Sequence, residues 1–227
     1  MTHPDDEISI CAWIKRLTDA GSEVFLSWTH SNDVREKEAR AVAKMLGVPQ
    51  ENLTFFGATD GRVCTQIGEL LPQFRQLMSD VQPDVVACGA FEQGHLDHDA
   101  TNFLVNRSFG GDVLEIPFYH TYLTKLQTMN TFSDPSGQEQ MTLSREEAKF
   151  KRAVAKQFKS QNIWKVLFWY EIWKLSQGDE VELSTREVMR LQTHTHFGAP
   201  NHPIAIASEV EASDTWKWWL ECIKPYV

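Results

Sequence analysis

The sequence predicts an α/β fold in which a mostly parallel sheet is covered by helices on both faces. Segments patterned as helices and segments patterned as strands alternate through the first half of the chain, which is typical of a parallel sheet wound with helices. The segment at residues 85–88 is apolar throughout, as expected of a strand buried on both faces. With 227 residues, of which 42% are hydrophobic, the chain is long enough for one substantial core, so we expect a single domain over residues 1–227.

The helices of the first half are predicted from apolar residues at helical spacing. The first is expected to end at Gly21 and the second at Gly47, since glycine favours helix C-termini. Asp33, with Glu36 three residues later, predicts a capping box at the start of the second helix. The apolar stripes are Cys11, Ile14 and Leu17 in the first helix, Ala39, Val42 and Leu46 in the second, and Ile67, Leu70, Leu71, Phe74, Leu77 and Met78 in the third.

Strands are predicted at short apolar runs bounded by turn residues. They cover residues 23–28, 53–56, 85–88 and 112–120. In a doubly wound sheet the polar segment at residues 3–7 should follow a strand, yet two residues alone precede it, whereas a strand needs about five. We therefore expect that the first strand has been truncated from the sequence, the alternative being that another segment fills its place.

The second half carries fewer regular patterns. Residues 128–142 are expected to form an exposed loop. Ser144 and Glu147 predict a second capping box, which opens a basic helix. Residues 163–175 hold five aromatic side chains; such density is typical of a buried core or an oligomer contact, and aromatic rims also suit sugar rings. A last, tryptophan-rich helix is predicted at residues 216–222.

The composition argues against several classes of partner. A net charge of −9 and an isoelectric point near 5.4 disfavour nucleic acid or an anionic membrane as the main partner. No apolar run approaches the roughly 20 residues that cross a bilayer, and the polar N-terminus is unlike a signal peptide. The four cysteines are widely spaced, so we expect buried, reduced thiols in a cytoplasmic protein rather than disulfides or a thiolate zinc site.

Two clusters of histidine and aspartate are the strongest functional signal. Residues 3–7 have the sequence HPDDE, and residues 94–98, soon after the predicted strand at 85–88, have the sequence GHLDH. Ligands of an open parallel sheet bind outside the carboxyl ends of its strands, so we expect the two clusters to lie together. Imidazole nitrogen and carboxylate oxygen are ordinary zinc ligands, and a catalytic zinc site takes three protein ligands and leaves a position open for water.

The expected metal ligands are His3, Asp6 and His98. His3 and Asp6 are three residues apart on a turn and can bend toward one point, and His98 supplies a third ligand from the other cluster. Zinc bound in this way would lower the pKa of its water toward about 7. Asp5, which lies beside a ligand without being one, is placed to accept the proton of that water.

The second cluster supplies the remaining groups for amide hydrolysis. Attack on an amide carbonyl creates an oxyanion, which needs a second positive or donor group besides the metal. We expect His95 to be that group and later the acid for the departing amine, with Asp97 orienting its ring. Neither a G-x-G-x-x-G motif nor a P-loop occurs where a strand meets a helix, so dinucleotide and phosphoryl-transfer functions are disfavoured.

The two motifs resemble the signature pair of the PIG-L (LmbE-like) family, zinc-dependent de-N-acetylases acting on N-acetylglucosaminyl conjugates. The resemblance extends to residues 35–47, 83–100 and 151–161. The resemblance implies a three-layer, Rossmann-like α/β/α sandwich. It also implies zinc on His3, Asp6 and His98, with Asp5 as the general base and His95 as the electrostatic or acid partner. This sequence departs from the family pattern in its missing first strand and in Leu96, which stands where proline is common.

The favoured function is a metal-dependent hydrolase that removes an acyl group, foremost acetyl, from an N-acetylglucosaminyl conjugate or a similar small amine. Zn²⁺ is the expected metal, with Fe²⁺ as an alternative. A different function is a catalytically silent, metal-containing protein of the same fold that binds a glycan or a subunit through its aromatic helix; a homo-oligomer stays open in either case. Substrate contacts are predicted at Tyr119, His120, Arg190 and His196.

Overall fold

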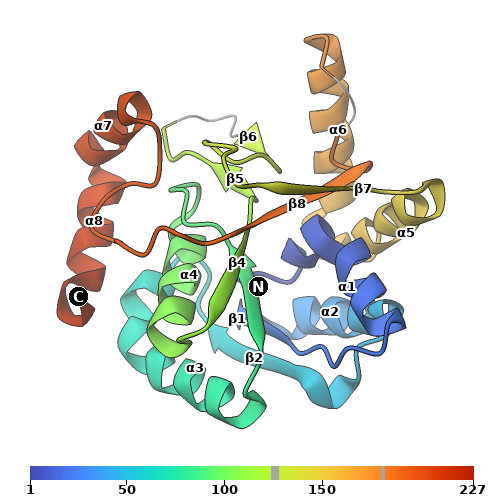
Figure 1. The fold of residues 1–227 in the computed structure, drawn as a ribbon, viewed down its shortest axis with the longest axis horizontal. Coiled ribbons are helices and arrows are strands. Elements are labelled where there is room, and N and C mark those ends of the chain that lie inside the picture. Colours follow the sequence, from blue (N-terminus) through green and yellow to red (C-terminus); the bar gives the residue numbers. More distant parts are fainter. Residues whose placement is uncertain (124–127, 180–181) are drawn as a thin grey trace. The chain divides into compact units, whose positions relative to one another are not determined.

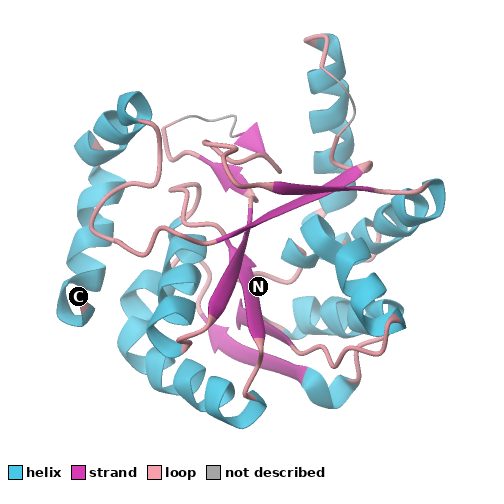
Figure 2. Cartoon of the chain, in the orientation of Figure 1, coloured by secondary structure: helices cyan, strands magenta, loops and turns pink. Residues whose placement is uncertain are grey.

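The computed structural model describes residues 1–123, 128–179 and 182–227 and confirms the predicted α/β class (Figures 1 and 2). The chain forms two compact units that alternate along the sequence. Unit 1 comprises Met1, His3–Gly57 and Gln140–Val188, and unit 2 comprises Thr2, Ala58–Glu139 and Met189–Val227. Each unit therefore joins segments that are far apart in the chain, and the HPDDE and GHLDH clusters belong to different units.

In unit 1 the strands β1 and β2 are hydrogen-bonded to each other. The backbone of Met1 bonds to β1, because its amino group donates to the carbonyl of Ser27 at 2.8 Å and its own carbonyl accepts from the N–H of Thr29 at 3.1 Å. A residue in front of the HPDDE segment thus pairs with β1 as a strand residue would. The elements are η1 Asp6–Ile10, α1 Cys11–Asp19, β1 Leu26–His30, α2 Asp33–Leu46, η2 Gln50–Asn52, β2 Leu53–Ala58, β7 Glu139–Thr142, α5 Arg145–Ala155, η4 Lys159–Gln161 and α6 Ile163–Ser176.

The two predicted capping boxes have different outcomes. The cap of α2 is Asn32, whose side chain accepts from two backbone N–H groups of the first turn, so the box predicted at Asp33 is wrong by one residue. The helix ends before Gly47 as predicted, and this glycine adopts a left-handed conformation with φ 81°. The box formed by Ser144 and Glu147 at the start of α5 is confirmed with both of its hydrogen bonds.

A buried carboxylate holds three segments of unit 1 together. Glu187 lies in β8, Arg186–Leu191, a strand that the sequence did not predict. It accepts the N–H groups of Ala12 at 2.9 Å and Trp13 at 2.8 Å in the first turn of α1, which has no side-chain cap of its own. It also pairs with Lys151 of α5, whose Nζ is 3.2 Å from its Oε1. A negative charge at a helix N-terminus is favourable, so this group fixes α1 against α5 and β8.

We expect Lys151→Met to lower the free energy of unfolding by about 3–5 kcal/mol, because it leaves the buried Glu187 carboxylate without its cation. Lys149→Met, at an exposed position of the same helix, is the matched control and should change the free energy of unfolding by less than about 0.5 kcal/mol. Urea unfolding followed by circular dichroism measures both. Equal, small effects in the two variants would show that the ion pair does not stabilise unit 1.

Unit 2 is built on β3 and β4, which are parallel as predicted, with Val85 opposite Asp112 and Gly89 opposite Ile116. The second half of β8 pairs with β4 in the antiparallel sense, so this sheet is mixed. β8 therefore belongs to both units, since its first three residues are part of unit 1. The elements are η3 Val63–Gln66, α3 Ile67–Val81, β3 Val85–Gly89, α4 Leu96–Ser108, β4 Asp112–Ile116, β5 Tyr119–His120, β6 Thr128–Met129, α7 Ile204–Ala212, α8 Asp214–Ile223 and η5 Lys224–Tyr226.

Several details of the second half differ from the prediction. The expected loop at residues 128–142 contains β6 and β7, the strand expected at 112–120 is divided into β4 and β5, and α7 was not predicted. The helix α4 begins at Leu96, inside the GHLDH segment. Three of the four cysteines are buried, as predicted.

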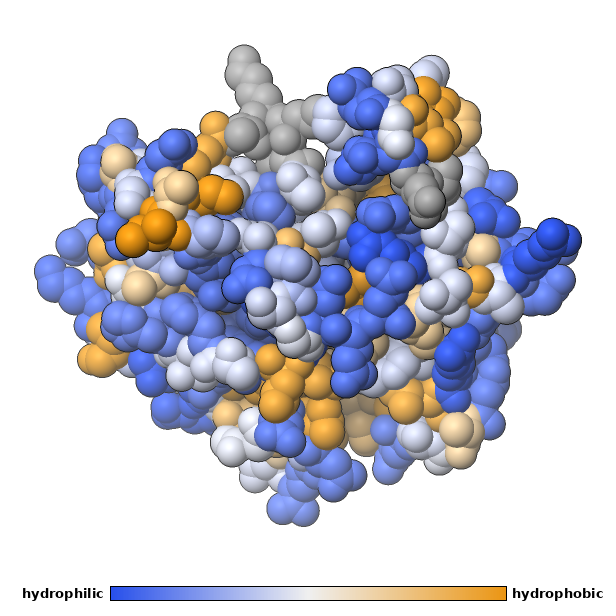
Figure 3. Space-filling model, turned by 45° about the horizontal axis from the view of Figure 1, so that its top comes forward, coloured by the Kyte–Doolittle hydropathy of each residue, from blue (hydrophilic) through white to orange (hydrophobic). Residues whose placement is uncertain are grey.

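The interiors are apolar and the exposed face is mainly polar. Four aromatic side chains in mutual contact fill the core of unit 2, namely Phe91, Phe103, Phe197 and Trp219. Figure 3 shows one face on which hydrophilic residues dominate and hydrophobic residues reach the surface in small separate groups. Every helix in the described part of the chain is too short or too polar to span a bilayer.

Candidate active site

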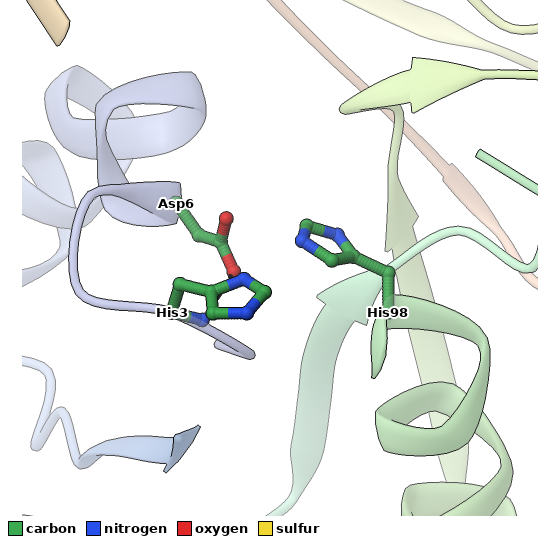
Figure 4. Close-up of side chains that lie close together, drawn as sticks. All are labelled: His3, Asp6 and His98. Atoms are coloured by element: carbon green, nitrogen blue, oxygen red, sulfur yellow. Dashed lines mark hydrogen bonds between the residues drawn. The ribbon is translucent and has the colours of Figure 1, made fainter. Parts of the chain in front are cut away.

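The first half of the candidate site is a tight turn in unit 1. The N–H of His3 donates to Oδ2 of Asp6 at 2.9 Å, and the N–H of Asp6 donates back to the carbonyl of His3 at 3.2 Å. Figure 4 shows both side chains on this one short segment, ahead of α1. Both residues are buried, with 7% and 8% of their surface exposed. The turn predicted from their spacing is therefore present, and it holds an imidazole and a carboxylate side by side.

Asp5, the predicted base, has an unusual backbone. Its φ of 134° is in the region that favours glycine, and strain of this kind is concentrated at functional sites. Its N–H donates to Oε2 of Glu7 at 3.0 Å, and the indole N–H of Trp28 donates to the same oxygen at 3.3 Å. Burial, followed by the charge of the neighbouring Asp6, raises the pKa of the Asp5 carboxyl well above its ordinary range. Burial likewise raises the pKa of Glu7 to about 7.

The second half is the N-terminus of α4 in unit 2. His95 is the cap of this helix, and its Nδ1 accepts the N–H of Asp97 at 3.2 Å. Both carboxylate oxygens of Asp97 accept backbone N–H groups of another loop, those of Gly61 at 2.6 Å and Val63 at 3.0 Å. Asp97 thus holds the segment that contains Gly61 and Val63 against the start of α4. No pattern in the sequence indicated these two bonds, and the predicted role of Asp97 in orienting His95 stays a prediction.

His98 lies in the first turn of α4, as Figure 4 shows, and is 4% exposed. Its Nε2 is 3.1 Å from the hydroxyl of Tyr119, at the start of β5. Its Nδ1 faces β3, because a Cβ built on Gly89 would lie 3.5 Å from that atom. A metal ion bound by His98 would therefore use Nε2 and would compete with the hydroxyl of Tyr119, which places one predicted substrate contact beside one predicted ligand.

The loop between β3 and α4 is held very close to β5. A Cβ on Gly94 would lie 1.6 Å from the carbonyl oxygen of Tyr119. The carbonyl of Gln93 also accepts the N–H of Tyr122 at 2.6 Å, and the N–H of Gln93 donates to the buried carboxylate of Asp99 at 3.2 Å. The GHLDH segment therefore requires glycine at its first position in order to bring His98 and Tyr119 together.

We expect Gly94→Ala to lower the free energy of unfolding by about 1–3 kcal/mol or more, because the new methyl group meets a backbone atom that cannot rotate away. The matched control is Gly110→Ala, where a Cβ meets nothing within 4 Å. Guanidinium unfolding of the two variants measures the difference. If the two substitutions cost the same, the close approach of Gly94 to β5 is not a feature of the folded protein.

The other predicted substrate contacts lie in different surroundings. Arg190 makes contacts within the protein. Its Nε donates to the buried Glu115 at 2.8 Å, and its guanidinium lies 4.0 Å from the ring centre of Phe132. His196 is exposed on the segment that precedes α7. His120 is buried beside His202, with ring centroids 5.7 Å apart. Contact with substrate stays a prediction for all of them.

Sequence reasoning missed a buried polar cluster around Glu92 in unit 2. Oε1 of Glu92 accepts the N–H of Ser133 at 2.9 Å, and the carbonyl of Glu92 accepts Nε2 of His202 at 2.7 Å. The other ring nitrogen of His202 is 2.7 Å from the hydroxyl of Ser133. Burial lowers the pKa of His202 to about 4 and raises that of Glu92 to about 8. The cluster combines residues from three loops, so no local motif could have revealed it.

The raised pKa of Glu92 predicts a pH-dependent stability. Between pH 4.5, the ordinary pKa, and pH 8, the folded protein holds a proton that the unfolded chain has lost, so the free energy of unfolding falls as pH rises through this window. We expect Glu92→Gln to raise the melting temperature relative to the parent at pH 8, and to lose this advantage near pH 4.5. For Glu211→Gln, at an exposed position, the difference in melting temperature from the parent should be the same at both pH values. Calorimetry measures the melting temperatures. A Glu92→Gln effect that is the same at both pH values would mean that Glu92 ionises normally.

Comparison with known proteins bears on both clusters. Residues 1–109, which include HPDDE and GHLDH, match the PIG-L family, described as GlcNAc-PI de-N-acetylase. The resemblance to the PIG-L family is confirmed. No curated protein matches the chain. The PIG-L match ends just after α4, so β4, β8 and the helices of the second half lie outside it.

Solved structures extend the likeness over most of the chain. An N,N'-diacetylchitobiose deacetylase from Pyrococcus horikoshii is 18% identical with a TM-score of 0.54, covering 84% of this chain and 80% of its own. A conserved protein from Thermus thermophilus is 17% identical with a TM-score of 0.60 and coverages of 84% and 91%. The zinc-inhibited form of a teicoplanin deacetylase is 14% identical with a TM-score of 0.56; it covers 85% of this chain and 97% of its own. At such identities these structures show that the fold is shared.

Proposed function

We propose that this protein is a metal-dependent N-deacetylase that releases acetate from an N-acetylglucosaminyl conjugate or a similar acylated amine. The observation that carries the proposal is the pair of PIG-L motifs, each held in a defined geometry. HPDDE forms a turn that presents a histidine and a carboxylate, and GHLDH forms a helix start that presents two histidines. Two of the similar solved structures are named as deacetylases, of a diacetylated chitobiose and of teicoplanin, which supports the same chemistry here.

The proposed metal ligands are His3, Asp6 and His98, the three side chains drawn in Figure 4. They offer two imidazole nitrogens and one carboxylate oxygen, a donor set that suits Zn²⁺ or Fe²⁺, and all three are buried. A divalent ion held there supplies positive charge that polarises a carbonyl and makes water more acidic. One similar structure is named as a zinc-inhibited form, so the choice between the two metals has to be measured for this protein.

The protein's own groups are proposed to handle the protons. Asp5 accepts the proton of the attacking water, a role suited to a carboxyl whose pKa is raised. His95 donates a hydrogen bond to the oxyanion and later passes a proton to the departing amine. Tyr119, beside Nε2 of His98, is the best placed of the predicted substrate contacts. Asp97 holds the helix start that carries both histidines.

We further propose that the two units form one PIG-L-type domain over residues 1–227, with the three-layer, Rossmann-like arrangement that the family implies. Similar solved structures that cover more than four fifths of this chain support that extent. A small amino-sugar-type molecule is the proposed substrate. The three buried thiols suit the reducing cytoplasm, which is the proposed location.

The proposal is tested by incubating the purified chain, stripped of metal and reloaded with Zn²⁺ or Fe²⁺, with N-acetylglucosamine and N,N'-diacetylchitobiose. We expect acetate and free amine to appear in equal amounts, and a chelator to stop the reaction. Binding of these sugars without release of acetate under either metal would favour the silent binding protein instead. Calorimetric titration on the same samples distinguishes that outcome from an inactive preparation.

A further inference from the structure

The helix α6 exposes an unusual number of large apolar side chains. Of its 14 residues Tyr170 alone is buried, so of the predicted alternatives the buried core is wrong, while the oligomer contact and the rim for a sugar ring stay predictions. The exposed apolar residues are Val166, Phe168, Trp169, Ile172, Trp173 and Leu175. Since an α-helix turns by about 100° per residue, these six lie on one half of its circumference, and Tyr170 lies on the other half. Figure 1 shows α6 extending beyond α5 within unit 1.

Exposed apolar side chains of this number are expected to be covered by a binding partner. Contiguous exposed apolar patches on folded proteins mark contacts with other proteins or with membranes. A helix of 14 residues is about 21 Å long, which is too short to cross a hydrocarbon core of about 30 Å. The helix α6 is therefore too short to span a bilayer, and its exposed half suits contact with a surface.

The charge around α6 decides between a lipid surface and a second copy of the chain. Residues 145–176, which form α5, η4 and α6, contain eight Lys or Arg and three Asp or Glu, whereas the rest of the chain contains 14 and 28. Five of these basic side chains are exposed, namely Arg145, Lys149, Lys156, Lys159 and Lys165. Two copies that met through this segment would bring positive charges together, while an anionic lipid surface attracts them.

The side-chain types on α6 also suit a lipid–water boundary. Tryptophan is enriched where the headgroups meet the hydrocarbon, because its ring is apolar and its N–H is polar. Two of the exposed side chains, Trp169 and Trp173, lie four residues apart and so share a stripe of the helix. Lys165, on the same half of the helix, has a long apolar stem that lets its ammonium group reach phosphate.

We propose that the exposed half of α6, together with the exposed basic residues of α5 and η4, docks on an anionic lipid bilayer. The net charge of −9 disfavours such a partner for the chain as a whole, but residues 145–176 carry an excess of positive charge. The aromatic side chains enter the headgroup region, and the lysines contact lipid phosphate. This proposal is independent of the proposed enzymatic function.

Vesicle sedimentation tests the proposal with the full chain. We expect the protein to pellet with vesicles of phosphatidylcholine and phosphatidylglycerol, to bind vesicles of pure phosphatidylcholine about tenfold less, and to be released by high salt. The double variant Trp169→Gln, Trp173→Gln should lose at least about tenfold in partitioning. The triple variant Lys149→Gln, Lys159→Gln, Lys165→Gln should lose the preference for anionic lipid.

The controls use matched residues outside α6. Trp218→Gln, at another exposed tryptophan, and Lys224→Gln, at another exposed lysine, should bind vesicles like the parent. Circular dichroism of every variant confirms that the helix is still formed. Failure of the parent to bind anionic vesicles, or equal loss with Trp218→Gln, would overturn the proposal. So would a parent dimer in light scattering that the Trp169, Trp173 double variant abolishes, because the second copy would then be the occupant.

Discussion

Replacing Asp5 by asparagine is expected to reduce the turnover number by about 10²–10⁴-fold, the usual contribution of a positioned general base. Asparagine has almost the same shape and tolerates positive φ better than most residues, so the φ of 134° at this position can persist. The metal should stay bound, because the proposed ligands His3 and Asp6 are unchanged. Acetate release and elemental analysis of the same preparation measure the two properties together.

The matched control for this variant is Asp33→Asn, at an exposed carboxylate of the same unit. It should keep the activity of the parent. Near-normal activity in Asp5→Asn would mean that another group accepts the proton of the water. A variant that loses its metal as well as its activity would show instead that Asp5 helps to bind the ion.

Replacing His98 by alanine is expected to reduce the metal content from about one ion per chain to nearly none, since a catalytic site with three protein ligands cannot spare one. His3→Ala should have the same effect. Because the two histidines belong to different units, equal losses would mean that one ion joins the two motifs. Elemental analysis after removal of loosely bound metal gives the result without reference to activity.

His196→Ala is the control for the loss of metal, because this histidine is exposed and is not a proposed ligand. It should keep one ion per chain. Tyr119→Phe should also keep it, and should bind the ion more tightly, because the hydroxyl that is now 3.1 Å from Nε2 of His98 is removed. Metal that remains in His98→Ala would point to a different set of ligands.

The sequence predicted the elements whose signals are local. The capping box of Ser144 and Glu147 and the existence of β3 follow from a few neighbouring residues. The burial of β3 on both faces was predicted wrongly, because Val85 is 49% exposed and only the end of the strand is buried. β8 could not be predicted in this way, because its buried Glu187 is compensated by Lys151 and by the start of α1, both far away in the chain. The helix α6 has the aromatic composition of a buried helix, yet most of its large side chains are exposed. Composition alone does not determine which segments pack against a helix.

In the candidate site, too, the local features were predicted and the long-range contacts were not. The turn between His3 and Asp6 follows from their spacing, and it was predicted. The bonds from Gly61 and Val63 to Asp97, and the approach of Tyr119 to His98, connect segments more than twenty residues apart in the sequence. Such contacts depend on the order of the strands, which periodicity does not determine.

One hydrogen bond at the start of α4 decides which nitrogen of His95 can act. Its Nδ1 accepts the N–H of Asp97, so in the neutral ring the proton is on Nε2. Forming the imidazolium would put a second proton on Nδ1 and break the cap of the helix. The cap therefore favours Nε2 as the nitrogen that donates to the oxyanion in the proposed reaction, and the proposed transfer of a proton to the amine requires an imidazolium that has given up this hydrogen bond.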